Sequence, residues 1–313
     1  MMPRDPRAML FAARDRAQRA LHAWRCRAIW STAPMPAGAS DAGLALVSQV
    51  SRRDLLMYLV AVKSALPVLG PAQVVQLDDG TLGPADRALL AAHLPGSACL
   101  PIAAVDTGDC PRGGTWERLC HILERAQASY VVQLDADTLA RGDMATVRAC
   151  IAANRPFALG TRLGRAPVAA TDAGSAGAGA HVQLAAEQAI AGLPGAAGLR
   201  YIRGSSGFAG FARGGFARAR LDEFSGLMQA RLGARWHEWG TEQVASNFAI
   251  ANSPGAMVLP WPEHACHDPG IDVARAGFLH FIGTHRFEGG AYGALSRAAI
   301  AAMPRADVTS RRR

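Results

Sequence analysis

Two aspartates directly after an apolar segment are the residues of this sequence best placed to do chemistry. Asp135 and Asp137 follow Tyr130–Leu134, which we predict to be a buried strand. In extended chain, positions i and i+2 place their side chains on the same face, so the two carboxylates converge. Converging carboxylates are what a hard divalent cation such as Mg²⁺ or Mn²⁺ needs. The alternative is an ordinary strand-to-loop turn, in which aspartate is common.

A partial internal repeat narrows the choice of metal-binding residues. Residues 74–82 read VVQLDDGTL and residues 131–139 read VVQLDADTL. Gly80 stands where the first copy would need its second carboxylate, so we predict metal binding for the second copy alone. Asp78 and Asp79 could hydrogen-bond a ribose or a base, or they could simply form an Asp-Gly turn.

These carboxylates need a scaffold, and the chain alternates predicted strands and helices from residue 44 onward. Such alternation implies right-handed β-α-β crossovers and a mainly parallel sheet with helices on both faces. Ligands bind at the carboxyl ends of the strands in such sheets, which is where Asp135 and Asp137 would lie. The predicted strands are Leu44–Val50, 74–77, Tyr130–Leu134 and 208–211, and the predicted helices are 53–66 (ended by Pro67), 84–94, 116–126, 143–153, 216–232 and 241–250.

Two other regions are predicted to be loops. Residues 164–180 are rich in glycine, alanine and proline, which is typical of a flexible loop. Residues 254–290 contain many glycines, prolines and histidines without periodicity, so we expect ordered loops that wrap the domain.

Composition and charge exclude several classes of protein. The chain has 313 residues, of which 50% are hydrophobic, 6% aromatic and 19% charged, which excludes a disordered, collagen-like or coiled-coil protein. The net charge of +8 comes from the two ends, because residues 1–30 contribute +5 and residues 305–313 contribute +3. The neutral body between them argues against a nucleic-acid-binding core.

The cysteines and the apolar runs give expectations about compartment. The six cysteines form no C-x-x-C pair, so we expect reduced thiols rather than a zinc module or a disulfide framework. His264, Cys266, His267 and Asp268 crowd one short stretch, but their spacing fits no usual zinc site. No run approaches the roughly 18 apolar residues of a membrane span, and the N-terminus lacks the apolar run of a signal peptide. We therefore expect a cytoplasmic protein.

A basic helix is predicted over residues 7–30. Its apolar residues recur at spacings of three, four and seven with arginines between them, at Leu10, Ala17, Leu21, Trp24 and Ala28. This helix could pack on the domain, or it could lie on an anionic membrane surface at the inner face. We divide the chain into a basic helical extension (residues 1–40), a main domain (residues 41–295) and a basic tail (residues 296–313).

The strand, the D-x-D and a later His-Phe-Ile-Gly at residues 280–283 resemble the GT-A fold nucleotide-sugar glycosyltransferases, especially the glycogenin-like and bacterial galactosyltransferase group. The resemblance covers about residues 44–290. It implies a single Rossmann-like α/β domain with a loop-rich C-terminal part. It also implies that Asp135, Asp137 and His280 together hold Mn²⁺ or Mg²⁺ against the diphosphate of the donor.

Further segments match the same family in order. Gly204–Phe211 (GSSGFAGF) resembles an N-S-G-V-type segment, residues 241–247 (TEQVASN) resemble the start of a D-Q-D-x-x-N helix, and residues 78–81 (DDGT) resemble a D-D-G-S turn. Arg118 could add a forked positive charge at the diphosphate. The residues for which the resemblance implies contact with the donor are Ser48, Asp78, Asp79, Arg118, Asp135, Ala136, Gly207 and Gly283.

The sequence departs from the family pattern where the transferred sugar would lie. Glu242 and Val244 replace the two aspartates of D-Q-D, and residues 204–207 lack the asparagine of N-S-G. Glu242 is our candidate catalytic residue, either as an acid/base or as a carboxylate that stabilises an oxocarbenium ion. Alternatively it is a first-turn carboxylate favoured by the helix dipole, with Thr241 as the N-cap. An inverting transfer would require a base near the acceptor hydroxyl, and a retaining transfer would not.

The predicted function is metal-dependent transfer of a sugar from a nucleoside-diphosphate sugar to an acceptor hydroxyl. We expect the acceptor to be a glycan or a lipid-linked glycan of bacterial polysaccharide synthesis, and we expect no nucleic-acid partner. One alternative is a non-catalytic carbohydrate- or membrane-binding protein on a GT-A scaffold. Another is an Asp-nucleophile phosphatase, whose signature requires threonine where Leu139 stands. A sugar nucleotidyltransferase is disfavoured because residues 50–53 contain no glycine.

Overall fold

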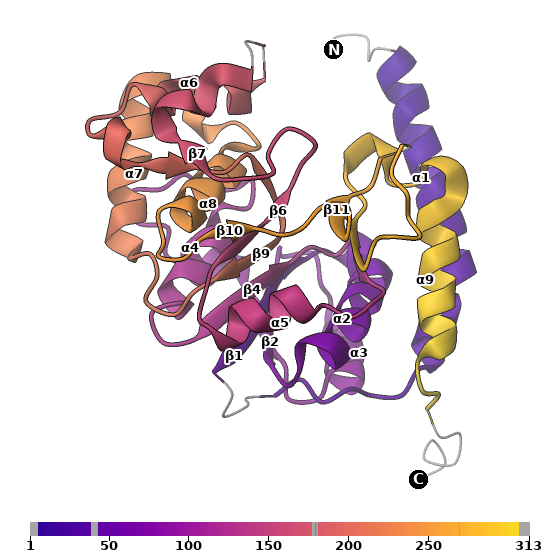
Figure 1. The fold of residues 1–313 in the computed structure, drawn as a ribbon. Coiled ribbons are helices and arrows are strands. Elements are labelled where there is room, and N and C mark those ends of the chain that lie inside the picture. Colours follow the sequence, from indigo (N-terminus) through magenta and orange to yellow (C-terminus); the bar gives the residue numbers. More distant parts are fainter. Residues whose placement is uncertain (1–5, 39–42, 177–178, 180, 269, 307–313) are drawn as a thin grey trace.

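A seven-stranded sheet forms the centre of the molecule (Figure 1). The computed structural model describes residues 6–38, 43–176, 179, 181–268 and 270–306. The strand order is β10-β6-β9-β4-β1-β2-β3, and β9 alone runs antiparallel to its neighbours among the described strands of this sheet. The fold class predicted from the sequence, a mainly parallel α/β domain, is confirmed. The strands are β1 (Leu44–Val50), β2 (Gln73–Asp78), β3 (Ala98–Pro101), β4 (Tyr130–Leu134), β6 (Phe157–Gly160), β9 (Gly204–Phe211) and β10 (Met257–Val258).

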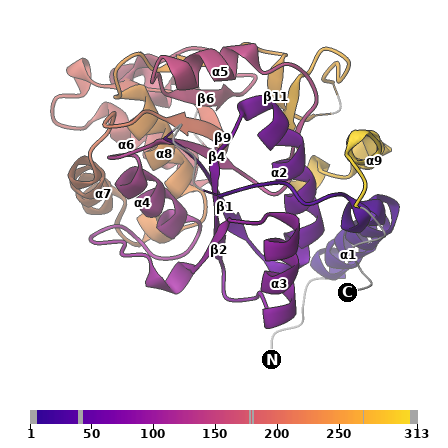
Figure 2. The same cartoon turned by 90° about the horizontal axis from the view of Figure 1, so that it is seen from below.

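Helices cover both faces of the sheet (Figure 2) because the buried strands are apolar on both sides. In β1, Leu44 and Leu46 belong to one apolar cluster, whereas Ala45 and Val47 between them belong to the other. The first cluster contains side chains of α2 (Leu55–Leu69), α3 (Pro84–His93) and α5 (Ala145–Ala152). The second contains side chains of α4 (Trp116–Arg125), α6 (Val182–Ala191), α7 (Arg218–Leu232) and α8 (Thr241–Ala251).

A second, three-stranded sheet joins the D-x-D segment to the C-terminal part of the chain. It consists of β5 (Thr138–Ala140), β12 (Phe278–His280) and β11 (His264–Cys266). β5 begins directly after Asp137 and pairs antiparallel with β12, so that His280 lies opposite Thr138. This pairing brings the late histidine beside the two aspartates.

The N-terminal helix packs on the domain. α1 (Pro6–Cys26) continues into a short 3₁₀ helix, Arg27–Ser31, and lies beside α9 (Ala291–Ala302) in both views (Figures 1 and 2). The imidazole of His22 stacks on the ring of Tyr292 at a centroid distance of 4.3 Å, and the side chain of Cys26, the last residue of α1, is fully buried. α9 runs across the predicted boundary between residues 295 and 296, and the division into three parts stays a prediction.

One predicted helix end was wrong. α2 continues through Pro67 to Leu69, although proline usually ends a helix. Pro67 lies in the last turn, where the missing N–H removes a single hydrogen bond, and Leu66 and Leu69 on either side are buried. Burial of these leucines therefore outweighs the unfavourable propensity. The chain leaves the helix at Gly70, whose φ of 94° favours glycine.

The predicted loop at residues 164–180 contains regular structure. β7 (Val168–Ala169) pairs with β8 (Arg200–Tyr201), and a 3₁₀ helix covers Ala170–Ala176, while residues 177, 178 and 180 lie outside the described residues. Ala170 and Ala173 are buried in the same cluster as Ala186 of α6, because small side chains allow close packing. The C-terminal loops hold β10, β11 and β12 and two short 3₁₀ helices, Gly283–His285 and Glu288–Gly290. Along the described part of the chain, no helix combines the length and hydropathy that crossing a membrane requires.

Candidate active site

A cavity of about 590 Å³ opens where β4 ends. Its wall combines acidic, basic and aromatic side chains from segments far apart in the sequence. The residues on which its chemistry depends are Asp135 and Asp137 after β4, Ser205–Gly207 of β9, Glu242 and Gln243 of α8, His280 of β12, and Arg118 and Arg286. A concave site with few convergent polar groups is the usual form of a ligand-binding site.

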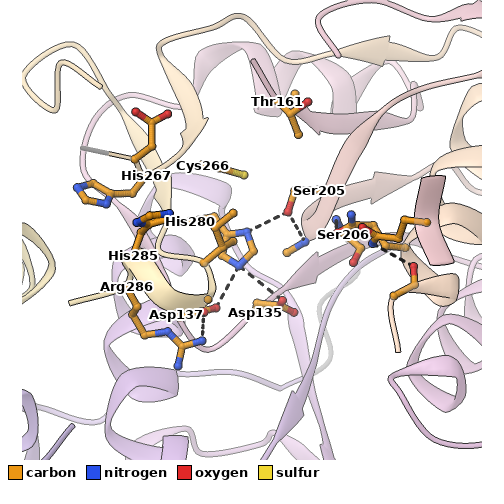
Figure 3. Close-up of a pocket in the computed structure, with 18 of the residues that line it drawn as sticks. Asp135, Asp137, Thr161, Ser205, Ser206, Cys266, His267, His280, His285 and Arg286 are labelled. Carbon is orange, nitrogen blue, oxygen red and sulfur yellow. Dashed lines mark hydrogen bonds and ion pairs between the residues drawn. The ribbon is translucent and has the colours of Figure 1, made fainter. Parts of the chain in front are cut away.

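Two carboxylates and one imidazole form a compact cluster in this cavity (Figure 3). The Nε2 atom of His280 lies 3.2 Å from Oδ1 of Asp137 and 3.7 Å from Oδ2 of Asp135. One potential ligand atom from each residue lies within 4.8 Å of the other two. The chemistry of the donors, two hard carboxylates and a borderline imidazole, fits a divalent cation such as Mn²⁺ or Mg²⁺.

β9 positions the imidazole. The Oγ atom of Ser205 lies 3.0 Å from Nδ1 of His280, which leaves Nε2 facing the aspartates (Figure 3). A hydrogen bond at the second ring nitrogen is how proteins orient a metal-binding histidine. Gly207 supplies the space, since a Cβ atom at this position would overlap the imidazole ring. Gly207 also accepts, through its carbonyl oxygen, a hydrogen bond from the N–H of Asp135 at 2.8 Å.

Each aspartate of the cluster is paired with its own arginine. Nη2 of Arg286 lies 2.5 Å from Oδ2 of Asp137, and Arg118 forms a short ion pair with Asp135. Burial alone would raise the pKa of Asp137, but the charges of His280 and Arg286 outweigh it and lower the pKa to about 2. Burial likewise opposes the charge on His280, and Asp137 reverses this effect and raises the pKa of His280 to about 10. The two aspartates, the histidine and the two arginines therefore form a network in which each carboxylate faces positively charged groups.

Arg118 links the aspartates to Glu242. Its Nη2 atom lies 3.6 Å from Oε1 of Glu242, whereas the pair with Asp135 is made through Nη1. Burial disfavours the charge of Arg118, while Asp135 and Glu242 together raise its pKa. The guanidinium is thus fixed by two carboxylates in a buried position, where it can donate several hydrogen bonds in a planar fork.

Glu242 is almost fully buried, with 2% of its side chain exposed. Its Oε2 atom accepts hydrogen bonds from the hydroxyl of Thr115 at 2.8 Å and from the hydroxyl of Ser206 at 3.4 Å. Burial raises the pKa of Glu242, and the charge of Arg118 opposes this effect. In the alternative, the N-cap assigned to Thr241 was wrong, because Gly240 caps α8 and the Thr241 hydroxyl donates to the carbonyl of Trp236 at 2.9 Å, but Glu242 does lie in the first turn of α8 as that alternative requires.

The structure brings together many of the residues expected to form the site, but not all. Those that line the cavity are Arg118, Asp135, Asp137, Gly207, Glu242, His280 and Gly283. Ser48, Asp78, Asp79 and Ala136 do not line it.

The DDGT segment forms a turn. Oδ1 of Asp78 accepts hydrogen bonds from the N–H groups of Gly80 and Leu82 at 2.8 and 3.2 Å, and Oδ2 forms a short ion pair with Arg87. Asp79 accepts from the N–H of Thr81 at 3.0 Å. These bonds are those of the Asp-Gly turn considered as the alternative for this segment.

Sequence reasoning missed several residues of the cavity. Arg286 follows His280 by six residues and had no periodic or paired signal. Gln243 stands inside the TEQVASN segment, where the resemblance could have pointed to it, and its Oε1 atom accepts from the N–H of Ser206 at 3.2 Å. Ser205 stands in the GSSG segment and was considered only as part of that motif. Thr115 had no signal at all.

The other possible metal ligands noted in the sequence, at residues 264–268, do not form a compact group of ligand atoms among the described residues. Asp268 forms an ion pair with Arg162 at 2.7 Å, and His264 is buried in β11. Within the described ranges, the cluster of Asp135, Asp137 and His280 is the one group of three histidine, cysteine or acidic residues with ligand atoms in mutual reach. The structure gives no support to a zinc site at residues 264–268.

Comparisons with known proteins identify the fold. No protein-family model matches the sequence, and no curated protein matches it. Among solved structures, the bifunctional glycosyltransferase WbbM in its apo form matches with a TM-score of 0.50 at 13% identity, over 85% of this chain and 51% of that chain. The galactosyltransferase LgtC, in complex with donor and acceptor sugar analogs, matches with a TM-score of 0.47 at 15% identity, over 85% of this chain and 99% of that chain. Core-mannan synthase A of Aspergillus fumigatus in its Mn/GDP form matches with a TM-score of 0.39 at 8% identity, over 72% of this chain and 75% of that chain.

The fold is that of the GT-A glycosyltransferases. The chain spans about half the length of WbbM, so the likeness concerns the fold of the matched part. The expected resemblance to GT-A enzymes is confirmed at the level of the fold. The alternative of an Asp-nucleophile phosphatase gains no support from these comparisons.

Proposed function

We propose that this protein is a metal-dependent glycosyltransferase that moves a sugar from a nucleoside-diphosphate sugar to a hydroxyl group of an acceptor. The observation that carries the proposal is the cluster of Asp135, Asp137 and His280, flanked by Arg118 and Arg286 in one cavity. The GT-A fold supports the proposal, because open α/β sheets bind their ligands at the carboxyl ends of the strands, and Asp135 and Asp137 directly follow β4.

The cluster would hold the cation through one oxygen of each aspartate and Nε2 of His280. When bound, a divalent cation supplies a Lewis acid that neutralises charge on the diphosphate leaving group. The two carboxylates suit Mn²⁺ or Mg²⁺, and the imidazole suits a transition-metal ion such as Mn²⁺ better than Mg²⁺. Ser205 keeps the imidazole in the orientation that this requires.

Arg118 and Arg286 would bind the diphosphate directly. Both arginines are paired with the carboxylates that hold the cation, so both guanidinium groups lie beside the position of the phosphates. Each presents permanent positive charge and forked N–H donors to phosphate oxygens. Preorganised charge of this kind stabilises the leaving group without reorganisation during the reaction.

Glu242 would act on the transferred sugar. Thr115 and Ser206 donate to one of its oxygens, and the guanidinium of Arg118 lies 3.6 Å from the other, where its charge opposes the rise in the pKa of Glu242 that burial causes. Because Oε2 already accepts two hydrogen bonds and Oε1 faces the guanidinium of Arg118, we assign Glu242 to the electrostatic stabilisation of positive charge at the anomeric carbon rather than to proton abstraction. The positive charge that develops at the anomeric carbon would then lie between the carboxylate of Glu242 and the diphosphate.

We also propose that the outer face of α1 contacts an anionic membrane surface at the cytoplasmic side, where a lipid-linked glycan would be available as acceptor. Met9, Leu21 and Trp24 are exposed on this helix, at 56%, 44% and 62%. The exposed arginines around them are Arg14, Arg16, Arg25 and Arg27. Apolar side chains surrounded by arginines suit an interface of anionic headgroups. Sedimentation with phosphatidylglycerol vesicles tests this proposal. We expect the wild-type protein to sediment with these vesicles and Arg16→Glu to weaken this binding. Equal recovery of the wild-type protein with neutral phosphatidylcholine vesicles would contradict the proposal.

Release of nucleoside diphosphate from nucleotide sugars tests the proposed enzyme. The purified protein is incubated with UDP-, GDP-, ADP- and TDP-sugars, each with Mn²⁺ or with EDTA. We expect release from one donor with Mn²⁺ only, and loss of this release in Asp135→Asn. Asp143→Asn is the matched control, because Asp143 forms a surface ion pair with Arg148. Metal-dependent binding of a donor without any release would instead favour a non-catalytic binding protein on this scaffold.

A further inference from the structure

Trp239 is exposed at the cavity wall. It is 72% accessible to solvent, whereas Trp236, three residues earlier, is fully buried and donates from Nε1 to the hydroxyl of Ser225 at 3.0 Å. Trp239 is also one of the residues that line the main cavity. An indole of this size left in solvent beside a ligand site is typical of a binding surface.

Hydrogen bonds hold the backbone next to Trp239 in place. The carbonyl oxygen of Gly240 accepts a hydrogen bond from Nε2 of Gln183 at 3.1 Å, and the φ of Gly240 is 102°, which favours glycine. Thr241 anchors the same segment through its buried hydroxyl, which accepts from Nε1 of Trp116 at 3.0 Å. The ring itself meets the imidazole of His181 edge to face, at a centroid distance of 6.3 Å.

Trp239 lies on the Glu242 side of the cavity. A Cβ atom added at Gly114 would be 3.8 Å from Cα of Trp239, and the next residue, Thr115, donates to Glu242. The backbone of Trp239 therefore lies beside the segment that contacts the carboxylate we assign to the transferred sugar. The donor diphosphate, by contrast, is assigned to Arg118, Arg286 and the aspartates.

A second, smaller cavity of about 290 Å³ adjoins the first. Four residues line both cavities: Thr161, Arg162, Gln183 and Gln243. The second cavity is also lined by Glu187, Tyr201 and Arg203, and Glu187 is 4% exposed.

The polar groups of this second cavity suit hydroxyl groups. The hydroxyl of Tyr201 donates to Oε1 of Glu187 at 3.2 Å, and Nη2 of Arg203 lies 3.2 Å from Oε2 of Glu187. Nη1 of Arg203 is buried and has no hydrogen-bond partner among the described residues. A buried donor without an acceptor is costly, and a sugar offers both oxygen acceptors and hydroxyl donors to such a pair.

We infer that the acceptor is a carbohydrate chain, with one sugar ring stacked on Trp239 and the next sugar extending past Gln183 and Gln243 toward the second cavity. The inference rests on the proposed glycosyltransferase function and names the class of its acceptor. The apolar C–H face of a sugar ring is complementary to the exposed indole, and its hydroxyls suit the amides between the cavities. Trp239 is thus a specificity-determining residue for the acceptor.

A printed array of oligosaccharides of defined sequence tests this inference, probed with the labelled full-length protein in the presence of Mn²⁺ and nucleoside diphosphate. The variants are Trp239→Ala, Trp239→Phe and, as control, Leu100→Ala, which removes an exposed apolar side chain of β3 that lines neither cavity. We expect Trp239→Ala to weaken glycan binding by about tenfold or more, because buried tryptophan contacts dominate many interfaces. Trp239→Phe keeps an aromatic face and is expected to retain most of the binding, and Leu100→Ala is expected to retain all of it. Binding of nucleoside diphosphate with Mn²⁺, measured by calorimetry, is expected to be the same in all four proteins.

Three results would overturn the inference. The first is glycan binding by Trp239→Ala equal to that of the wild type. The second is a wild-type protein that binds nucleoside diphosphate but none of the glycans. The third is loss of nucleoside diphosphate binding in Trp239→Ala, which would place the indole in the donor site. Glycan binding through Trp239 in a protein that binds no nucleoside diphosphate would support the inference while it contradicts the proposed transferase.

Discussion

The backbone N–H of Phe281 donates a hydrogen bond to the carbonyl oxygen of Asp137 at 2.8 Å. This bond ends the pairing of β5 with β12, which places His280 opposite Thr138. The imidazole is thereby held beside Asp135 and Asp137 although it comes from the other end of the domain. The candidate metal site is therefore assembled by strand pairing, and its geometry depends on both the D-x-D turn and the C-terminal segment.

Asp137→Asn is expected to weaken Mn²⁺ binding by about 100-fold, or about 2.7 kcal/mol. The amide keeps the shape of the side chain and removes the negative charge that faces His280 and Arg286. Electron paramagnetic resonance of free Mn²⁺ measures the dissociation constant. Asp143→Asn should leave that constant unchanged, and an equal constant in Asp137→Asn would remove this residue from the site.

Gly207→Ala should disrupt the metal site without touching any ligand. The added methyl group would overlap the imidazole of His280 and force it away from the aspartates. We expect Mn²⁺ affinity to fall by about tenfold or more, as for other residues that orient metal ligands. Gly226→Ala on α7 is the control, because nothing lies within 4 Å of its added methyl group and alanine favours the helix. Unaltered Mn²⁺ affinity in folded Gly207→Ala would show that His280 does not bind the cation.

Arg286→Ala is expected to lower the affinity for nucleoside diphosphate with Mn²⁺ by about tenfold, because a charge-assisted hydrogen bond contributes about 1.5–3 kcal/mol. Arg286→Lys should recover part of this loss, since it restores the charge but not the forked geometry. Calorimetric titration of each variant provides the affinities. Arg165→Ala is a suitable control, because Arg165 stacks over Trp261 and does not line the cavity. Identical affinities for Arg286→Ala and the wild type would contradict a phosphate contact.

Lys63 should make stability depend on pH in the alkaline range. Its ammonium group is buried between the hydroxyl of Thr32 at 2.9 Å, the carbonyl of Ala33 at 2.7 Å and the ring of His93 at 2.9 Å, and no carboxylate of the described chain forms an ion pair with it. Burial lowers the pKa of Lys63 from 10.5 to about 8. Between these two values the unfolded chain binds a proton that the folded chain does not, so this group makes the free energy of unfolding rise with pH.

Urea unfolding of wild type and Lys63→Met across pH 7 to 11 measures this effect. The difference between the two free energies of unfolding is expected to shift in favour of the wild type from about pH 8 to pH 10.5 and to be flat below pH 8. Parallel curves over the whole range would show that Lys63 keeps its ordinary pKa in the folded protein.

The sequence was most informative where a pattern is long or local. The helices α4, α7 and α8 were predictable because apolar side chains repeat over several turns, and β1 and β4 because their apolar runs are bounded by polar residues. The convergence of Asp135 and Asp137 was predicted from the geometry of extended chain, whereas in the structure residues 135–137 form a turn between β4 and β5 that brings the two carboxylates together. Short strands such as β3, β5 and β12 have too few residues for a period to be visible, and their pairing is decided by tertiary contacts.

Some residues of the candidate site could not be predicted from the sequence for the same physical reason. Arg286 reaches Asp137 only after β12 has paired with β5, and no local property of its sequence neighbours indicates that contact. Asp78 could serve a ligand or a turn, and its ion pair with Arg87 in α3 is a tertiary contact that the turn motif does not reveal. The exposed position of Trp239 at the cavity wall could not be predicted, because exposure cannot be inferred from an isolated tryptophan.

The most direct test of the central claim is calorimetric titration of the wild-type protein with UDP, GDP, ADP, TDP and CMP, each in Mn²⁺ and in EDTA. A donor site built on Asp135, Asp137 and His280 predicts that one nucleotide binds in Mn²⁺ and that its affinity falls by about tenfold or more in EDTA. Binding that is equally strong in EDTA, or no binding of any nucleotide in Mn²⁺, would contradict a metal-bridged donor site in this cavity.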